Sequence, residues 1–308
     1  MTLTDTRNEF LAGRISKPDF IHIMYERHHS KLFDYGTYLK QTNIASIEIT
    51  DDSVIMTSRD NGIRMACPTG DYRVAPVEAL NFLDYESEDS AMIMKLVAAA
   101  QNIVDIGANM GWYSINIAKT FPDCHVYAFE PIPRTFDFLE RNIQLNALEN
   151  IHAYPFGLSN ERKDLVFYYY TEGSVNASSA NLSERVDADL ITCQVERLDD
   201  FVDSLKLRVD FIKCDVEGAE LFAFQGGLET LKRDKPIVFT EMLRKWAAKF
   251  NYHPNKIINI FSSIGYRCFY VKGDHLNEIR EITEVTAETN FFFLHDVQHC
   301  QQINALIN

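Results

Sequence analysis

The chain has 308 residues, of which 46% are hydrophobic and 24% charged, and its formal net charge at pH 7 is −14. This composition is ordinary for a globular protein, and the length suits about two domains or one domain with an extension. A nucleic-acid substrate requires clustered cations, and the sequence has no Lys- or Arg-rich run, so nucleic acid is not an expected partner.

The cysteines and the apolar runs indicate the cellular compartment of the protein. None of the six cysteines has CxxC or zinc-type spacing, and four lie in apolar, strand-like runs: Cys124, Cys193, Cys214 and Cys268. They are expected to be buried thiols in a reducing compartment. Neither a signal peptide nor an apolar run of roughly 18 residues is present, so we expect no membrane span and a cytoplasmic location.

Residues 1–85 are predicted to form an extension made of a helix and a β-hairpin. Ser16 to Asp19 resembles a capped helix start, and the apolar spacing that follows predicts a helix over about 18–38. Apolar residues then alternate from 44 to 67, where Asn61-Gly62 is a typical hairpin turn. Two hypotheses, a cap over the substrate cleft and a homodimer contact, stand beside a simple packing role.

From residue 86 onward, strand-like and helical patterns alternate, which requires right-handed crossovers and a parallel sheet. Five buried strands and a closing pair are predicted, at 103–106, 126–129, 151–156, 209–214, 236–241, 266–271 and 290–294. A small, polar segment at 173–183 is either a functional loop or a flexible connection.

The stretch 103–114, IVDIGANMGWYS, predicts a strand, a turn and the start of a helix. Glycines at such a turn adopt positive φ and let a ligand approach the backbone, beside unpaired helical N–H groups. The stretch lacks the third glycine of a dinucleotide GxGxxG motif, and an acid at the strand end suits a cationic ligand group better than a diphosphate. The candidate binding residues are Asp105, Gly107, Asn109, Gly111, Tyr113 and Ser114. Bracing of the turn by Asp105 and core packing of Tyr113 are the alternatives.

A second acid indicates a nucleoside. Glu130 closes the next strand, 25 residues after Asp105, where a carboxylate can accept both ribose hydroxyls. Gly157 and Leu158 follow the third strand, at the edge where the adenine would lie. One acid for an amino acid group and one for a ribose describe S-adenosylmethionine.

Further acids follow the fourth and fifth strands. Lys213 lies within the fourth strand, where a buried ammonium needs a carboxylate partner. Asp215, Glu217 and Glu241 qualify by position as a general base, with Asp215 preferred and Glu241 second. Close carboxylates would raise at least one pKa, and Lys213 could keep the others ionised. Alternatively, Glu217 and Glu220 cap a helix, or the three candidate bases bind Mg²⁺, which loss of activity with EDTA would reveal.

These motifs, in this order, resemble the FkbM-type family of S-adenosylmethionine-dependent methyltransferases over about residues 100–245. The motifs are DIGANMGWYS from residue 105, AFEPIP from 128, FIKCDVEGAE from 211, and the strand ending at Glu241. The resemblance implies an α/β, Rossmann-like seven-stranded methyltransferase sheet over 86–308. It also implies S-adenosylmethionine as cofactor, Asp215 and Glu217 in the cleft, and methyl transfer to a hydroxyl of a sugar, glycan or secondary metabolite.

Two other functions fit parts of the pattern. A nucleotide-binding oxidoreductase is supported by Gly107, Gly111 and Glu130 but opposed by the missing GxGxxG. A non-catalytic S-adenosylmethionine-binding subunit would keep the glycine turn, but it would not need Asp215 and Glu241.

Overall fold

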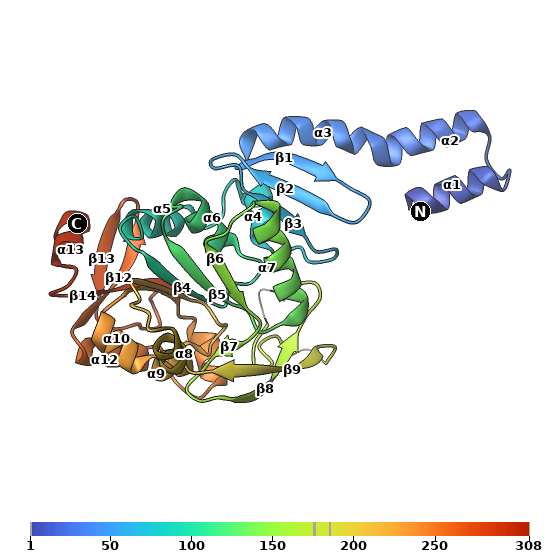
Figure 1. Cartoon of the computed structure of the whole chain (residues 1–308). Helices are drawn as coiled ribbons and strands as arrows, with labels where there is room; N and C mark the ends of the chain where they lie inside the picture. The colour runs from blue at the N-terminus through green and yellow to red at the C-terminus, as the bar shows by residue number, and fades with distance from the viewer. Residues whose placement is uncertain (1, 175–176, 185, 308) are drawn as a thin grey trace.

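The computed structural model describes residues 2–174, 177–184 and 186–307. At its centre lies a sheet with the strand order β13-β12-β14-β11-β10-β4-β5-β6 (Figure 1). The parallel strands are β4 (Asn102–Ile106), β5 (His125–Phe129), β6 (Ile151–Tyr154), β10 (Phe211–Cys214) and β11 (Ile237–Glu241). The antiparallel strands are β12 (Tyr266–Lys272), β13 (His275–Ile279) and β14 (Asn290–His295). This confirms the α/β, Rossmann-like sheet with its seven predicted strands.

The eighth strand, β13, lies at the edge of the sheet, between the two closing strands that the sequence predicts. It pairs along its length with β12, and Leu276 also forms an isolated bridge to Ile307. Among its residues Leu276 is fully buried while Ile279 is half-buried. One fully buried side chain in five residues gives almost no apolar alternation, so the pattern does not predict this strand.

Helices cover both faces of the sheet because neighbouring strand residues point to opposite sides. Ile103 packs into the core beneath one helical layer and Val104 into the core beneath the other. The first layer contains α5 (Ser87–Leu96), α6 (Trp112–Thr120) and α7 (Pro133–Leu145). The second contains α8 (Leu198–Leu205), α9 (Glu220–Gly226), α10 (Leu228–Asp234) and α12 (Asn255–Ser263). Three further helices are α4 (Ala75–Phe82), α11 (Arg244–Lys249) and α13 (Cys300–Leu306).

A second, smaller sheet lies beside the carboxyl edge of the main one (Figure 1). It has the order β7-β9-β8, with β7 (Gly157–Leu158), β8 (Lys163–Tyr169) and β9 (Asp189–Glu196). The segment 173–183 lies in the connection between β8 and β9, and its residues Val175 and Asn176 lie outside the described residues. Within it, the Ser178 hydroxyl donates to the Glu217 carbonyl at 2.9 Å, which ties this segment to the loop after β10.

The N-terminal extension contains more elements than the predicted helix and hairpin. Its helices are α1 (Leu3–Leu11), α2 (Lys17–Met24), the π-helical turn η1 (Tyr25–His29), α3 (Ser30–Tyr38) and the 3₁₀ turn η2 (Leu39–Gln41). A three-stranded antiparallel sheet follows, with β1 (Ile44–Ile49), β2 (Val54–Ser58) and β3 (Arg64–Cys67). The turn at Asn61-Gly62 joins β2 to β3 as predicted, and the turn at Asp51-Asp52 adds β1.

The three-stranded N-terminal sheet, β1-β2-β3, is attached to the main domain through α7. The Asn142 side chain accepts from the Ala66 N–H at 2.7 Å, and that of Asn146 accepts from the Arg64 N–H at 2.9 Å. The helices α2 and α3 instead project away from the domain, with α1 folded back beside α2 (Figure 1). Among the described residues, no helix has both the length and the apolar character that crossing a bilayer requires.

Candidate active site

A cavity of about 490 Å³ opens at the carboxyl ends of β4, β5, β10 and β11. This is the edge where open α/β sheets bind ligands, and the volume suits a cofactor or small molecule. Predicted site residues that line the cavity are Gly107, Asn109, Tyr113, Glu130, Lys213, Asp215, Glu217 and Glu241. The strand ends therefore bring most of the predicted candidates to one cavity.

The turn after β4 depends on its glycines. Gly107 has φ +76°, and a Cβ there would lie 1.9 Å from the backbone oxygen of Asp215. Gly111 has φ +92°, and its Cβ would lie 2.6 Å from a methyl group of Leu139. Any side chain at Gly107 would push apart the two loops that carry the site, so close backbone approach and positive φ both require glycine.

Lys213 links the turn after β4 to the loop after β10. Its side chain is buried, and its Nζ donates to the Gly107 carbonyl at 2.6 Å and lies 3.3 Å from Asp105 Oδ1 and 3.8 Å from Asp215 Oδ2. Burial alone would lower the pKa of Lys213, but the two carboxylates outweigh it and raise that pKa above its usual range. This buried lysine was expected to have a carboxylate partner, and it has two.

Asp105 braces the turn. It is almost fully buried, and its Oδ2 accepts a hydrogen bond of 2.6 Å from the Ser114 hydroxyl while its Oδ1 faces Lys213. Neither Asp105 nor Ser114 is among the residues that line the cavity. Of the two roles considered for Asp105, these contacts favour support of the glycine turn.

Glu130 lines the cavity from the end of β5. Its two carboxylate oxygens accept hydrogen bonds from the Asn109 N–H at 3.0 Å and the Ile132 N–H at 2.9 Å. Burial raises the pKa of Glu130 to about 7, although both N–H groups oppose this shift. The backbone therefore fixes a carboxylate beside the glycine turn, and each of its oxygens keeps a second lone pair for a ligand.

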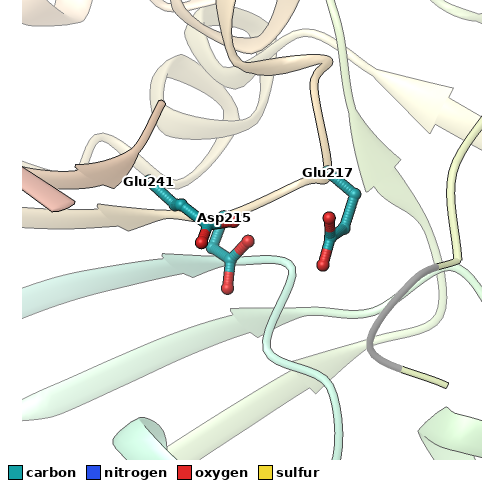
Figure 2. Close-up of side chains that lie close together, drawn as sticks. All are labelled: Asp215, Glu217 and Glu241. Carbon is teal, nitrogen blue, oxygen red and sulfur yellow. The ribbon is translucent and has the colours of Figure 1, made fainter. Parts of the chain in front are cut away.

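Asp215, Glu217 and Glu241 form a cluster of carboxylates on the other side of the cavity. One oxygen from each lies within 4.8 Å of the others (Figure 2). Asp215 Oδ1 and Glu217 Oε2 are buried without a hydrogen-bond partner. Burial, together with repulsion between the acids, raises the pKa of Glu241 to about 9 and that of Glu217 well above its ordinary value. Burial also raises the pKa of Asp215, but there Lys213 opposes the shift.

Glu220 has a different role from Glu217. Its carboxylate accepts from the N–H groups of Val216 at 3.2 Å and Gly218 at 2.9 Å, and from the Tyr252 hydroxyl at 3.1 Å. Glu217 has φ +53° and its side chain faces the cavity. Glu220, in the first turn of α9, therefore closes the loop before this helix without a side-chain cap bond to it, and Glu217 faces the cavity instead.

Glu86 is a cavity residue that the sequence did not predict. It has φ +45°, and its carboxylate accepts hydrogen bonds from the Tyr113 hydroxyl and from the Asn290 amide at 3.2 Å. In the sequence it stands among the acids at the start of α5, a pattern that normally indicates only a helix N-terminus. Other unpredicted lining residues are Arg73, Tyr85, Trp112, Lys245 and Trp246.

Three further predicted residues do not reach the cavity. Gly157 and Leu158 form the short strand β7, and the Leu158 side chain is buried in the core beneath the second helical layer. Gly111 contributes its conformation to the turn, but it is not a lining residue. The predicted adenine contacts at β7 therefore have no support in this geometry.

Comparison with known proteins agrees with the sequence motifs. The model of the Methyltransferase FkbM domain matches residues 105–268. Methyltransferase 1 of Beauveria bassiana is 32% identical over 143 residues, which cover 40% of this chain and 57% of that protein. The 2-O-methyltransferase NoeI of Sinorhizobium fredii is 28% identical over 154 residues, covering 45% and 62%. Both relatives are thus matched over less than two thirds of their length.

Among solved structures, Methyltransferase FkbM from Methylobacillus flagellatus is similar at 18% identity and a TM-score of 0.40, covering 63% of this chain and 43% of that one. The family match spans more than half of the chain, from the strand that carries Asp105 to β12. It includes the glycine turn, Glu130 and the three clustered acids. The chain therefore belongs to the FkbM methyltransferase family.

Proposed function

We propose that this methyltransferase transfers a methyl group from S-adenosylmethionine to a hydroxyl of a sugar, glycan or secondary metabolite. One observation carries the proposal: Glu130 beside the glycine turn and the three clustered acids line the same cavity. The first group suits a nucleoside and the second suits proton removal. Transfer to oxygen is supported by the name of NoeI, a 2-O-methyltransferase, whereas the acceptor class rests on the family resemblance.

Each part of the chain has a defined task in this mechanism. When bound, S-adenosylmethionine supplies a methyl group that is already activated by its sulfonium. Glu130 accepts hydrogen bonds from the ribose hydroxyls. The turn from Gly107 to Gly111 lets the cofactor approach the backbone closely. Asp215 removes the proton of the acceptor hydroxyl, because Lys213 favours its ionised form whereas Glu241 retains its proton at neutral pH.

Positioning and proton removal account for the rate. Alignment of two bound reactants supplies roughly 7–11 kcal/mol, and a general base contributes about 10²–10⁴ in rate. An acceptor hydroxyl that is not activated needs both contributions. Trp112 and Tyr113 line the cavity and give it apolar surface that excludes water from the reacting groups.

The cofactor assignment is tested by calorimetric titration with S-adenosylhomocysteine, with NAD⁺ titrated under the same conditions. We expect the thioether to bind in the micromolar range and NAD⁺ not to bind. Glu130→Gln should weaken thioether binding about tenfold or more, because loss of a charge-assisted hydrogen bond to a ribose hydroxyl costs about 1.5–3 kcal/mol.

Glu220→Gln is the matched control for this titration. Glu220 is also a buried carboxylate that accepts two backbone N–H groups, with a pKa raised to about 7, but it is not a lining residue. Its substitution should leave the thioether affinity unchanged. Binding of NAD⁺ in place of the thioether would refute the cofactor assignment, and equal effects of both substitutions would refute the role of Glu130.

A divalent cation held by the three clustered acids is a second candidate feature of the site. The observation that favours it is the pair of buried oxygens without partners, Asp215 Oδ1 and Glu217 Oε2. Carboxylate oxygens are the ligands that Mg²⁺ prefers, and the donor set contains no nitrogen or sulfur. Such a cation would replace the protons that otherwise relieve repulsion within the cluster, and it would favour ionisation of a bound hydroxyl.

If the cation is present, removal with EDTA should abolish methyl transfer, and added Mg²⁺ or Mn²⁺ should restore it. Calorimetric titration of the chelated protein with Mg²⁺ should show one site, which Glu217→Gln weakens. Full activity after exhaustive chelation would contradict the cation and leave Asp215 as the unaided base.

A further inference from the structure

The helical segment at the N-terminus exposes an unusual amount of apolar surface. Of the 18 large hydrophobic side chains that are exposed in the described part of the chain, eight lie within the first 41 residues. We call residues 2–41 the arm. From α2 to η2 the arm is helical throughout, and none of the residues from 17 to 41 is buried.

The arm has little internal support. Phe10 of α1 stacks on Phe20 of α2 with 4.6 Å between ring centroids, which holds α1 against α2. Towards the domain, the Tyr38 hydroxyl is 3.5 Å from the Asn81 carbonyl. Helices of this length owe most of their stability to packing of an apolar face, and in α3 no such face is covered by the described residues of this chain.

The exposed apolar residues form one broad surface along α2, η1 and α3. Tyr25 and Phe33 share a side, because their ring centroids are 6.4 Å apart although eight residues separate them. The surface consists of Ile21, Tyr25 and Phe33, which are 49–70% exposed, with Leu32 at its margin. Aromatic side chains bury about 150–250 Å² each when covered, so this surface offers on the order of 300 Å² of apolar area. A standard interface covers roughly 800 Å² per partner, of which the polar residues on the same side of the helix would supply the rest.

The charge of the arm indicates what covers this surface. The arm carries six Lys or Arg and five Asp or Glu, which is a net charge of +1, whereas residues 42–308 carry 24 and 39, a net charge of −15. Two copies of so acidic a chain repel each other at most surfaces, but they meet without repulsion at the arm. A membrane surface would instead select an excess of cations on the polar side of the helix.

We propose that the arm pairs with the arm of a second copy of this chain, burying Tyr25 and Phe33 at the centre of a symmetric dimer. Two-fold pairing brings the same surface of each copy together, so the apolar stripe and the balanced charges are both self-complementary. Aromatic residues are enriched at the centres of such interfaces. This inference does not rest on the proposed function, because the arm contributes no residue to the cavity lining.

The test is sedimentation velocity of the full chain across micromolar concentrations. The expected mass is twice the 35.4 kDa of one chain. Phe33→Glu and Tyr25→Glu should each raise the dissociation constant of the dimer about tenfold or more. The control is Val285→Glu, which also places a carboxylate at an exposed apolar side chain, 92% exposed on the catalytic domain. It should leave the dimer unchanged.

Unchanged far-ultraviolet circular dichroism and cooperative thermal unfolding of both arm variants would establish that they are folded. A wild-type chain that remains at 35.4 kDa, or a dimer unaffected by both arm substitutions, would overturn the proposal. So would a monomer that sediments with phosphatidylserine vesicles, which would assign the arm to a membrane surface.

Discussion

Asp215→Asn is expected to lower kcat by about 10²–10⁴, the contribution of a general base. The asparagine keeps the shape of the side chain, but it cannot accept the proton of the acceptor hydroxyl. In the wild-type enzyme the base is active when ionised, so activity should fall as the pH falls through the raised pKa of Asp215. The pH profile of Asp215→Asn should lose this limb. Release of S-adenosylhomocysteine with an acceptor found in a glycoside screen is the measurement.

Asp210→Asn is the control for this experiment. Asp210 directly precedes the same strand at its opposite end, where its carboxylate accepts from the N–H groups of Gln101 at 3.0 Å and Asn102 at 3.1 Å. Its substitution should affect stability and leave kcat unchanged. If Asp215→Asn loses less than about tenfold in kcat, Asp215 is not the base, and Glu241→Gln becomes the variant to examine.

Lys213→Met is expected to lower the free energy of unfolding by about 3–5 kcal/mol, because it leaves Asp105 as a buried charge without a counter-ion. Equilibrium unfolding in urea at pH 7 is the measurement. The raised pKa of Lys213 lies above 10.5, so the stabilisation by the wild-type ion pair is fully present below that pH and is lost only as the pH rises through the folded-state pKa.

The loss in this variant should be compared with the loss at a lysine that pairs with no carboxylate. Lys119→Met is the matched control, since Lys119 also donates to a glycine carbonyl, that of Gly62, at 2.8 Å but has no carboxylate partner among the ion pairs of the described residues. It should cost about 1 kcal/mol. Equal losses in both variants would refute the bridging role of Lys213.

Local chemistry explains why much of the site could be predicted. A glycine turn after a buried strand, an acid at the end of the next strand and a lysine that needs a carboxylate are each visible in the sequence. Parallel strands then bring their carboxyl ends to one edge, which places Glu130 and the three clustered acids around one cavity.

What the sequence did not predict depends on tertiary placement. Glu86 and Trp246 reach the cavity only because α5 and α11 begin beside it, and no local pattern encodes that distance. The role of Asp105 depended on whether its partner was a ligand or Ser114, which spacing alone leaves open. The helix α1 did have a local signal, the capping box of Thr2 and Asp5, but it lacks a clear apolar stripe.

The wall formed by Arg73, Tyr85 and Glu86 precedes Asp105, where the family match begins. Substitutions in this short stretch change the shape and charge of the cavity without touching the strands that carry Glu130 or Asp215. This wall and the proposed cofactor and base residues are therefore encoded in separate parts of the gene. Variation confined to Arg73, Tyr85 and Glu86 can reshape one side of the cavity while the strands that carry Glu130 and Asp215 stay intact.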